Sequence, residues 1–200
     1  MQFQKDDRRE KILTAAGETF LTQGFGKASM REIAKKAGIS TSNMYNYFKS
    51  KEELFYAIAD PVFHHLANLR KEVFEYKANK DFKNENFMQQ FIEFVPSAMF
   101  EMVRKYRKEL LLIMDSSKGT KYEPLKKMVV TTMETNFTEN IISKKKKRLL
   151  RDSFLMHILA MNLIEGILEI TRNYKNDEWA KNNIDSLMKY HIRGMVEFFT

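Results

Sequence analysis

A run of polar side chains between residues 41 and 47 has the residue types that contact nucleic acid. The run reads Thr41-Ser42-Asn43-Met44-Tyr45-Asn46-Tyr47. Its hydroxyl, carboxamide and phenol groups are short or flat, so they can form hydrogen bonds with base edges or with phosphate oxygens. The run therefore favours DNA contact, although an ordinary helical hairpin with polar surface residues shows the same types.

The neighbouring residues predict how this run is held. Ser29 and Glu32 form a capping box, which predicts a helix over residues 30–36, and Ser40 predicts a second helix from 41 to about 47. Gly38 lies between the two, where a turn with positive φ favours glycine. Apolar residues at packing spacing join the two helices: Ile33, Ala34, Ala37, Ile39, Met44 and Phe48. This arrangement is typical of a helix-turn-helix.

Helical periodicity continues through the remainder of the chain. Gly24 should stop the first helix, Ser50 should cap the helix that follows it, and Pro61 and Pro96 should kink two long helices. The predicted helices cover residues 9–21, 30–36, 41–47, 51–77, 86–106, 107–114, 123–142, 149–172 and 177–199. The predicted fold class is all-α, with a three-helix helix-turn-helix domain at the N-terminus.

Positive charge is concentrated near the N-terminus. Residues 1–51 contain ten Lys and Arg against five Asp and Glu, and the whole chain of 200 residues carries +8. Phosphate contacts draw on such charge, although a solubilising surface needs it too. A hydrophobic share of 44% excludes wholesale disorder, and the 7 Gly and 3 Pro are too few for a turn-rich sandwich or barrel.

The sequence lacks the residues or the spacings that several kinds of chemistry require. Because there is no Cys, disulfides, thiolate zinc sites and cysteine nucleophiles are excluded, and a cytoplasmic location is expected. No metal-ligand spacing appears among the histidines, which are His64, His65, His157 and His191. With no phosphate loop or nucleophile elbow either, we expect no metal, no cofactor and no enzymatic activity.

Two other segments have ordinary explanations. The longest uncharged apolar run, residues 153–164, has twelve residues and is too short to span a membrane, so no membrane association is expected. The densest basic run, residues 144–148, lies about a hundred residues from the helix-turn-helix. We expect it to be a solvated helix end rather than a second DNA contact.

A linked set of positions runs through residues 19–54. It reads Thr19-Phe20, Gly24-Phe25, Ser29-Met30-x-x-Ile33-Ala34-x-x-Ala37-Gly38-Ile39-Ser40 and Met44-Tyr45-x-Tyr47-Phe48-x-Ser50-Lys51-Glu52-Glu53-Leu54. The set resembles the N-terminal domain of the tetracycline-repressor (TetR) family over about residues 8–55. The resemblance implies a homodimeric, ligand-responsive transcriptional repressor, with a DNA-binding domain over 1–52 and an effector-binding and dimerisation domain over 53–200.

The resemblance also implies which residues contact the DNA. They are Ser29, Arg31, Thr41, Ser42, Asn43, Tyr45, Asn46, Tyr47 and Lys51. Thr41, Ser42 and Asn43 would meet bases, while Tyr47 and Lys51 would hold phosphates. Many family members have Gly-Thr-Leu-Tyr where this chain has Ser-Asn-Met-Tyr at 42–45, so the operator preference of relatives does not transfer. Asn43, which stands where those members have Thr, can bind adenine through two hydrogen bonds.

Phe and Met are frequent in the C-terminal part, where the family surrounds a ligand. The predicted pocket residues are Phe87, Phe91, Phe94, Met99, Met102, Met133, Phe137, Met156 and Met161. As a set they favour a small apolar or aromatic effector, because Met fills irregular space and Phe lines apolar pockets. Each residue taken singly also fits a simple hydrophobic core.

The last two helices are predicted to form the dimer interface. The helix over 149–172 is apolar on nearly all sides, and the helix over 177–199 has one apolar stripe, so a partner could complete a four-helix bundle. The predicted interface residues are Phe154, Ile158, Leu168, Ile184, Met188, Ile192 and Met195. Two alternatives stay open: a helical ligand-binding or interaction protein whose helix-turn-helix does not read DNA, and a nonspecific DNA binder.

Overall fold

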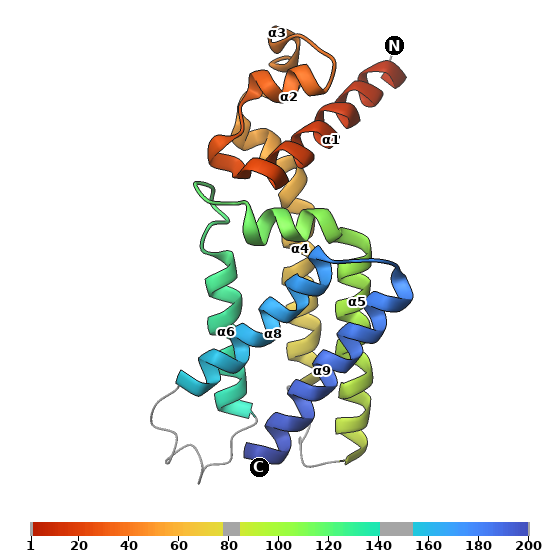
Figure 1. Cartoon of the computed structure of the whole chain (residues 1–200), viewed down its shortest axis with the longest axis vertical. Coiled ribbons are helices and arrows are strands. Elements are labelled where there is room, and N and C mark those ends of the chain that lie inside the picture. The colour runs from red at the N-terminus through yellow and green to blue at the C-terminus, as the bar shows by residue number, and fades with distance from the viewer. Residues whose placement is uncertain (1, 78–84, 141–153, 200) are drawn as a thin grey trace. The chain divides into compact units, whose positions relative to one another are not determined.

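The computed structural model describes residues 2–77, 85–140 and 154–199, and helices make up nearly all of them (Figure 1). In chain order these are α1 (Gln2–Lys27), α2 (Met30–Lys36), α3 (Thr41–Met44), α4 (Lys51–Lys77), α5 (Glu85–Asp115), α6 (Leu125–Asn140), α8 (Phe154–Arg172) and α9 (Asp177–Phe199). No strand occurs in these residues. The predicted all-α class is confirmed. The basic run at 144–148 and the start of the helix predicted at 149 lie outside the described residues.

Two compact units divide the chain. The first comprises Met1–Leu66 and Tyr106–Leu125, and the second comprises Ala67–Lys105 and Lys126–Thr200. The first unit therefore combines α1–α3 with the beginning of α4, the end of α5 and the loop that follows α5. Because the units divide inside α4 and α5, the functional boundary expected between residues 52 and 53 stays a prediction.

Helix interruptions fall where backbone geometry requires them. Gly24 has φ 77° and ψ 160° and ends the regular part of α1, as the sequence predicted. In α5 the irregular residue is Tyr106, with φ −124° and ψ 28°, at the predicted junction between two helices. α4 continues through Pro61 and α5 through Pro96 with helical backbone angles, so neither proline ends its helix.

The core of the first unit is built around three phenylalanine rings. Phe55 of α4 makes edge contacts with Phe20 and Phe25 of α1, at centroid distances of 5.2 and 5.3 Å. All three side chains are buried, together with Ile12 and Ala16 on the same stripe of α1. Aromatic pairs in this geometry stabilise beyond the area they bury. The cluster thus fixes the first turns of α4 against α1.

The loop after α5 packs on the same unit. The Phe25 N–H donates to the Ser116 carbonyl at 2.9 Å, and Ser116 and Ser117 are buried. Further along, Tyr122 is buried and its hydroxyl donates to Asp60 of α4. Lys121 Nζ lies 3.0 Å from the same carboxylate. The loop therefore contacts both the end of α1 and the first half of α4.

In the second unit α8 and α9 pack along each other (Figure 1). Each buries one face, which includes Leu163 and Ile167 of α8 and Ile184 of α9. Gly166 allows the close approach, because a Cβ atom there would lie 2.8 Å from Leu187 Cδ2. The two helices thus form a hydrophobic pair within one chain.

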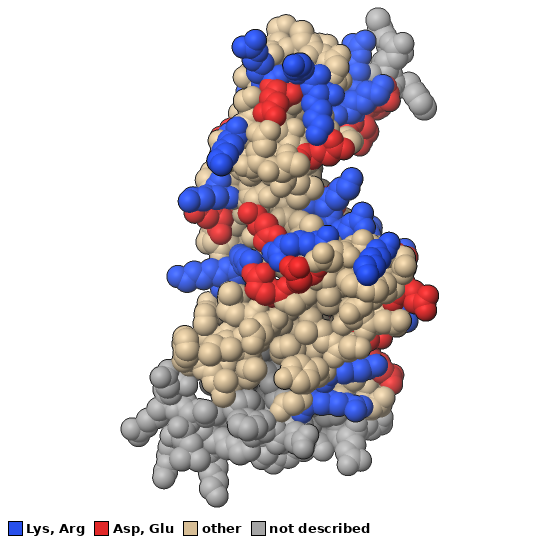
Figure 2. Space-filling model, in the orientation of Figure 1, with Lys and Arg blue, Asp and Glu red and all other residues tan. Residues whose placement is uncertain are grey.

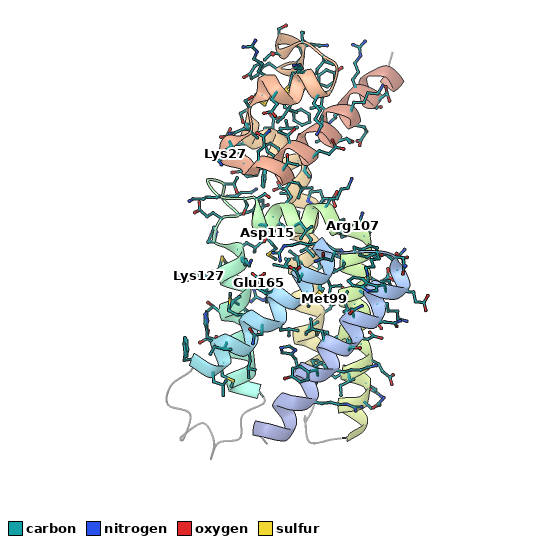
Figure 3. All side chains as sticks on the ribbon, in the orientation of Figure 1. Lys27, Met99, Arg107, Asp115, Lys127 and Glu165 are labelled. Atoms are coloured by element: carbon teal, nitrogen blue, oxygen red, sulfur yellow. The ribbon has the colours of Figure 1, made fainter. Side chains whose placement is uncertain are left out.

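α8 is by length and composition apolar enough to cross a membrane, with a mean hydropathy of 1.5 over its most apolar window. However, seven of its residues are buried inside the protein. Glu165 of α8 (labelled in Figure 3) also pairs with Lys126 of α6, and hydrogen bonding from Lys126 lowers the pKa of Glu165. α8 therefore has the length and composition of a membrane span, while one of its faces packs against its own chain.

Candidate nucleic-acid interface

The turn between α2 and α3 has the geometry that the sequence predicted. Ser29 Oγ accepts from the Glu32 N–H at 3.2 Å, and Ser40 Oγ accepts from the Asn43 N–H at 3.2 Å. Gly38 has φ 70°, and the residue after it donates back to α2. Both caps are therefore confirmed, and glycine is required in the turn because other residues rarely adopt positive φ.

The polar run continues helical turns beyond the end of α3 at Met44. The Tyr47 and Phe48 N–H groups both donate to the Met44 carbonyl, at 2.9 and 3.1 Å. Met44 and Phe48 are buried, so one side of the segment is anchored in the core of the first unit. The side chains between them are directed away from that core, which leaves residues 41–47 able to meet a ligand.

The predicted DNA-contact residues differ in exposure. Ser29, Arg31, Ser42, Tyr45 and Asn46 are exposed, while Thr41, Asn43, Tyr47 and Lys51 are half-buried. Two of the exposed groups are held by neighbours: Ser42 Oγ lies 3.1 Å from Ser40 Oγ, and Asn46 Nδ2 donates to Asn43 Oδ1 at 3.3 Å. The arrangement gathers hydroxyl, carboxamide and phenol groups on one surface, which is the chemistry that base edges and phosphates require.

Basic side chains surround this surface. Figure 2 shows Lys and Arg over the part of the molecule formed by α1, α2 and α3. One residue that the sequence analysis did not single out is Arg9 of α1, whose guanidinium lies 5.4 Å from the centroid of the Phe48 ring. Only the folded chain brings Arg9 beside the end of the polar run, because the two residues share no sequence motif. Lys36, by contrast, is paired with Glu18 at 2.7 Å.

The ammonium group of Lys51 forms hydrogen bonds with backbone carbonyls of the same chain. It donates to the Phe25 carbonyl at 2.8 Å, to the Ala28 carbonyl at 2.9 Å and to the Gly26 carbonyl at 3.4 Å. It also lies 4.4 Å from the centroid of the Phe25 ring. The sequence placed Lys51 at the start of a helix, but it gave no sign of these contacts with the end of α1.

The predicted pocket residues all belong to helices, and their burial varies. Phe91, Met102 and Met156 are buried, and Phe94, Met99, Met133 and Met161 are half-buried. Figure 3 labels Met99 on α5. The side chains of Phe87 and Phe137 lie outside the described part of the chain. Within the described residues, no three His, Asp or Glu side chains are grouped so that they could hold a metal ion.

The predicted interface residues fall into two groups. Leu168, Ile184, Met188 and Ile192 are buried within the chain's own helices. Phe154 and Ile158 of α8 are exposed, with 63% and 38% of their surface accessible, and so is Leu155 beside them. The side chain of Met195 lies outside the described residues. Among the predicted interface residues whose side chains are described, Phe154 and Ile158 are the ones that a partner molecule can reach.

These features define an all-α protein with an N-terminal helix-turn-helix. Residues 12–58 match the family model described as bacterial regulatory proteins, tetR family. This match overlaps the segment, about residues 8–55, over which the motif set resembles the TetR family. The family model is described as one of bacterial regulatory proteins, and the relatives that match this segment are named as transcriptional regulators.

Relatives match the same N-terminal segment. The transcriptional activator FasR of Mycolicibacterium smegmatis is 44% identical over 54 residues, which is 27% of this chain and 25% of FasR. The transcriptional regulator UidR of Escherichia coli is 45% identical over 58 residues, which is 29% of this chain and 30% of UidR. The match thus spans between a quarter and a third of the length of these curated relatives.

Solved structures resemble nearly the whole chain. The fatty acid degradation regulator FadR from Bacillus halodurans has a TM-score of 0.57 at 16% identity, over 94% of this chain and 95% of that one. NalD of Pseudomonas aeruginosa, a secondary repressor of a multidrug efflux pump, has a TM-score of 0.52 at 18% identity, over 96% of each chain. At these identities the likeness concerns the fold alone.

Proposed function

We propose that this protein is a transcriptional repressor that reads a palindromic operator as a homodimer and is released by a small apolar or aromatic effector. The observation that carries the proposal is the recognition segment, residues 41–47, which is anchored on its buried side by Met44 and Phe48 and presents polar groups on the other. The match of residues 12–58 to the family model of bacterial regulatory proteins supports the same role. Because its proposed ligand is an operator on the chromosome, we also propose that the protein acts in the cytoplasm.

The DNA-binding proposal is tested with the full-length protein and a selected operator. An operator is first isolated by repeated selection from random duplexes, and affinity is then measured by fluorescence anisotropy at several salt concentrations. We expect specific binding with a salt-dependent affinity. Asn43→Ala should lower affinity for the best site by about 1–3 kcal/mol and relax preference at one base pair.

Two outcomes identify the alternatives. Equal affinity for all duplexes would indicate a nonspecific binder, and no affinity for any duplex would indicate an interaction protein whose helix-turn-helix does not read DNA. Transcription in vitro from a promoter that contains the selected site then gives the sign of regulation. An increase in transcript would replace repression by activation.

The dimer proposal concerns the exposed apolar side chains of α8. Phe154, Leu155 and Ile158 are adjacent along one helix, and apolar patches of this kind on a soluble protein mark interaction surfaces. One recognition segment also contacts too few base pairs to select a site in a genome, so a twofold partner is needed. Ile158→Asp should yield a folded monomer in sedimentation velocity experiments at micromolar concentration.

A matched control is Met128→Asp on α6, which also alters an exposed apolar residue. This variant should remain dimeric. Substitution of Leu168 or Ile192 by Arg does not serve the purpose, because both are buried in the chain's own core and an unpaired charge there would unfold it. A monomeric unmodified protein would contradict the dimer proposal.

The effector proposal is tested by reciprocity. An uncharged aromatic probe such as N-phenyl-1-naphthylamine is titrated against the protein with and without operator. If the probe lowers operator affinity by some factor, operator must lower probe affinity by the same factor, because both shift one equilibrium. Binding of the probe with no change in DNA affinity would contradict release by an effector of this class.

A further inference from the structure

The ammonium group of Lys51 has as many carbonyl partners as it has protons. Lys carries three N–H donors. The carbonyls of Phe25, Gly26 and Ala28 lie within 2.8–3.4 Å of Nζ. These carbonyls belong to the last turn of α1 and to the residue after it, where helical acceptors have no partner within the helix. The ammonium therefore caps the short turn that follows the interruption of α1 at Gly24, and it is supplied by the first residue of another helix.

The surroundings of Lys51 favour this role over a phosphate contact. Backbone carbonyl oxygens carry partial negative charge, so hydrogen bonds from a cation to several of them are strengthened by the charge. The first turn of α4 contains Glu52 and Glu53, and it is already capped: the Glu53 N–H donates to Ser50 Oγ at 3.1 Å, and the Glu53 carboxylate accepts from the Lys49 N–H at 2.6 Å. A phosphate would have to displace the ammonium from three acceptors and approach two carboxylates.

The capped segment leads directly into the helix-turn-helix. Ala28 precedes Ser29, which is the N-cap of α2. The Phe25 N–H is bound to Ser116 while its carbonyl is bound to Lys51. The ammonium thus connects the start of α4 to the residues that set where α2 begins.

We propose that Lys51 is a positioning residue, which fixes α2 and α3 relative to α4 and does not contact DNA. The role in DNA reading rests on the function proposed above. It departs from the phosphate contact that the family resemblance implied for Lys51. Loss of the ammonium should change operator affinity through the protein's geometry rather than through the number of phosphates bound.

Salt dependence distinguishes the two roles. Operator affinity of the full chain is measured over a range of salt for the unmodified protein, for Lys51→Met and for Lys51→Arg. A lost phosphate contact reduces the slope of log affinity against log salt by about 0.9. We expect Lys51→Met to lose at least tenfold in affinity at every salt concentration, with an unchanged slope and a lower melting temperature.

Lys51→Arg provides a second test. Its planar guanidinium retains the charge but does not match three carbonyls arranged around one nitrogen. We therefore expect it to lose affinity as Lys51→Met does. Retained affinity in Lys51→Arg would overturn the proposal, as would a reduced slope or an unchanged affinity in Lys51→Met. Lys49→Met is the matched control for the change in charge.

A measurement without DNA keeps the proposal testable if no operator is found. Lysine acetylation by acetic anhydride is followed by mass spectrometry in the DNA-free protein. Because its amine is held by three carbonyls, Lys51 should react at least tenfold more slowly than the exposed Lys49, and added operator should not slow it further. Equal reactivity of the two lysines would overturn the cap, whatever the protein binds.

Discussion

The helix-turn-helix and the α8–α9 pair stabilise helices in different ways. In the first, Ser29 and Ser40 each accept a backbone N–H from the residue three positions later at 3.2 Å, and Ser50 does the same at 3.1 Å for the adjacent α4. In the second, the helices are held by their buried apolar faces and by a close approach at Gly166. The helices α2, α3 and α4 thus begin at serine caps, whereas α8 and α9 depend mainly on the apolar surface that they share.

The largest change in the free energy of unfolding is expected at Phe55. This variant tests whether the polar caps alone stabilise the first unit. Phe55→Ala removes a buried ring with two aromatic neighbours, and we expect a loss of about 3–5 kcal/mol in the free energy of unfolding. Urea unfolding followed by circular dichroism measures it. The exposed Tyr45→Ala should change stability little. A small loss in Phe55→Ala would mean that the polar caps dominate.

A smaller effect is expected at the close approach of α8 and α9. Gly166→Ala should be less stable than Gly194→Ala by about 1 kcal/mol, because the new Cβ would lie 2.8 Å from Leu187 Cδ2 and that side chain would have to move. Gly194→Ala on α9 is the matched control, since nothing lies within 4 Å of its Cβ position. It should gain about 0.5–1 kcal/mol from its better helix propensity. An equal gain in the free energy of unfolding in both variants would show that α8 and α9 are not closely packed at Gly166.

The caps should differ in function rather than in stability. Ser40→Ala and Asn176→Ala each remove an N-cap, because Asn176 Oδ1 accepts from the Trp179 N–H at 2.8 Å before α9. Each should cost about 1 kcal/mol in thermal unfolding. Only Ser40→Ala should also weaken operator binding in the anisotropy assay. Equal losses of DNA affinity would remove the functional distinction between the two regions.

The smallest effect at neutral pH concerns Tyr122. Burial, together with the hydrogen bond to Asp60, raises the pKa of Tyr122 to about 12. Since the folded-state pKa lies above the ordinary value of 10.0, this contribution to stability is complete below pH 10 and is lost as the pH rises toward 12. The difference in absorbance at 295 nm between the unmodified protein and Tyr122→Phe should show the late ionisation. Ionisation of Tyr122 near pH 10 would contradict the buried geometry.

Asp60 responds at the other end of the pH range. Partial burial raises the pKa of Asp60, but hydrogen bonds from Tyr122 and Lys121 outweigh it, and the net pKa is lowered. Its contribution to stability is therefore present above the ordinary value of 3.8 and is lost as the pH falls below it. Asp60→Asn should flatten the acid side of the stability curve.

Sequence signals predicted the features that depend on a few adjacent residues. The caps at Ser29 and Ser40, the turn at Gly38 and the interruption at Gly24 each follow from local backbone chemistry, and all occur. The helix limits before Met30 and after Lys36 were predicted for the same reason.

Features that join distant segments were not predicted. Nothing near Lys51 in the sequence indicates that its amine reaches Phe25, and periodicity does not tell which apolar side of α8 meets α9. Leu168 and Ile158 have the same apolar character, yet one is buried by its own chain and the other is exposed. Their difference depends on tertiary packing, which the pattern of one helix does not contain.

The hydrogen bond between Phe25 and Ser116 has a consequence for synthesis on the ribosome. The first unit is formed by two separate stretches of the chain, Met1–Leu66 and Tyr106–Leu125. The unit cannot be completed during synthesis until the second stretch has emerged from the ribosome. At typical rates of elongation, about 5–20 residues per second, the delay is roughly 3–12 s. During this interval the nascent helix-turn-helix lacks its cover at Phe25, and an excised N-terminal fragment would lack it permanently.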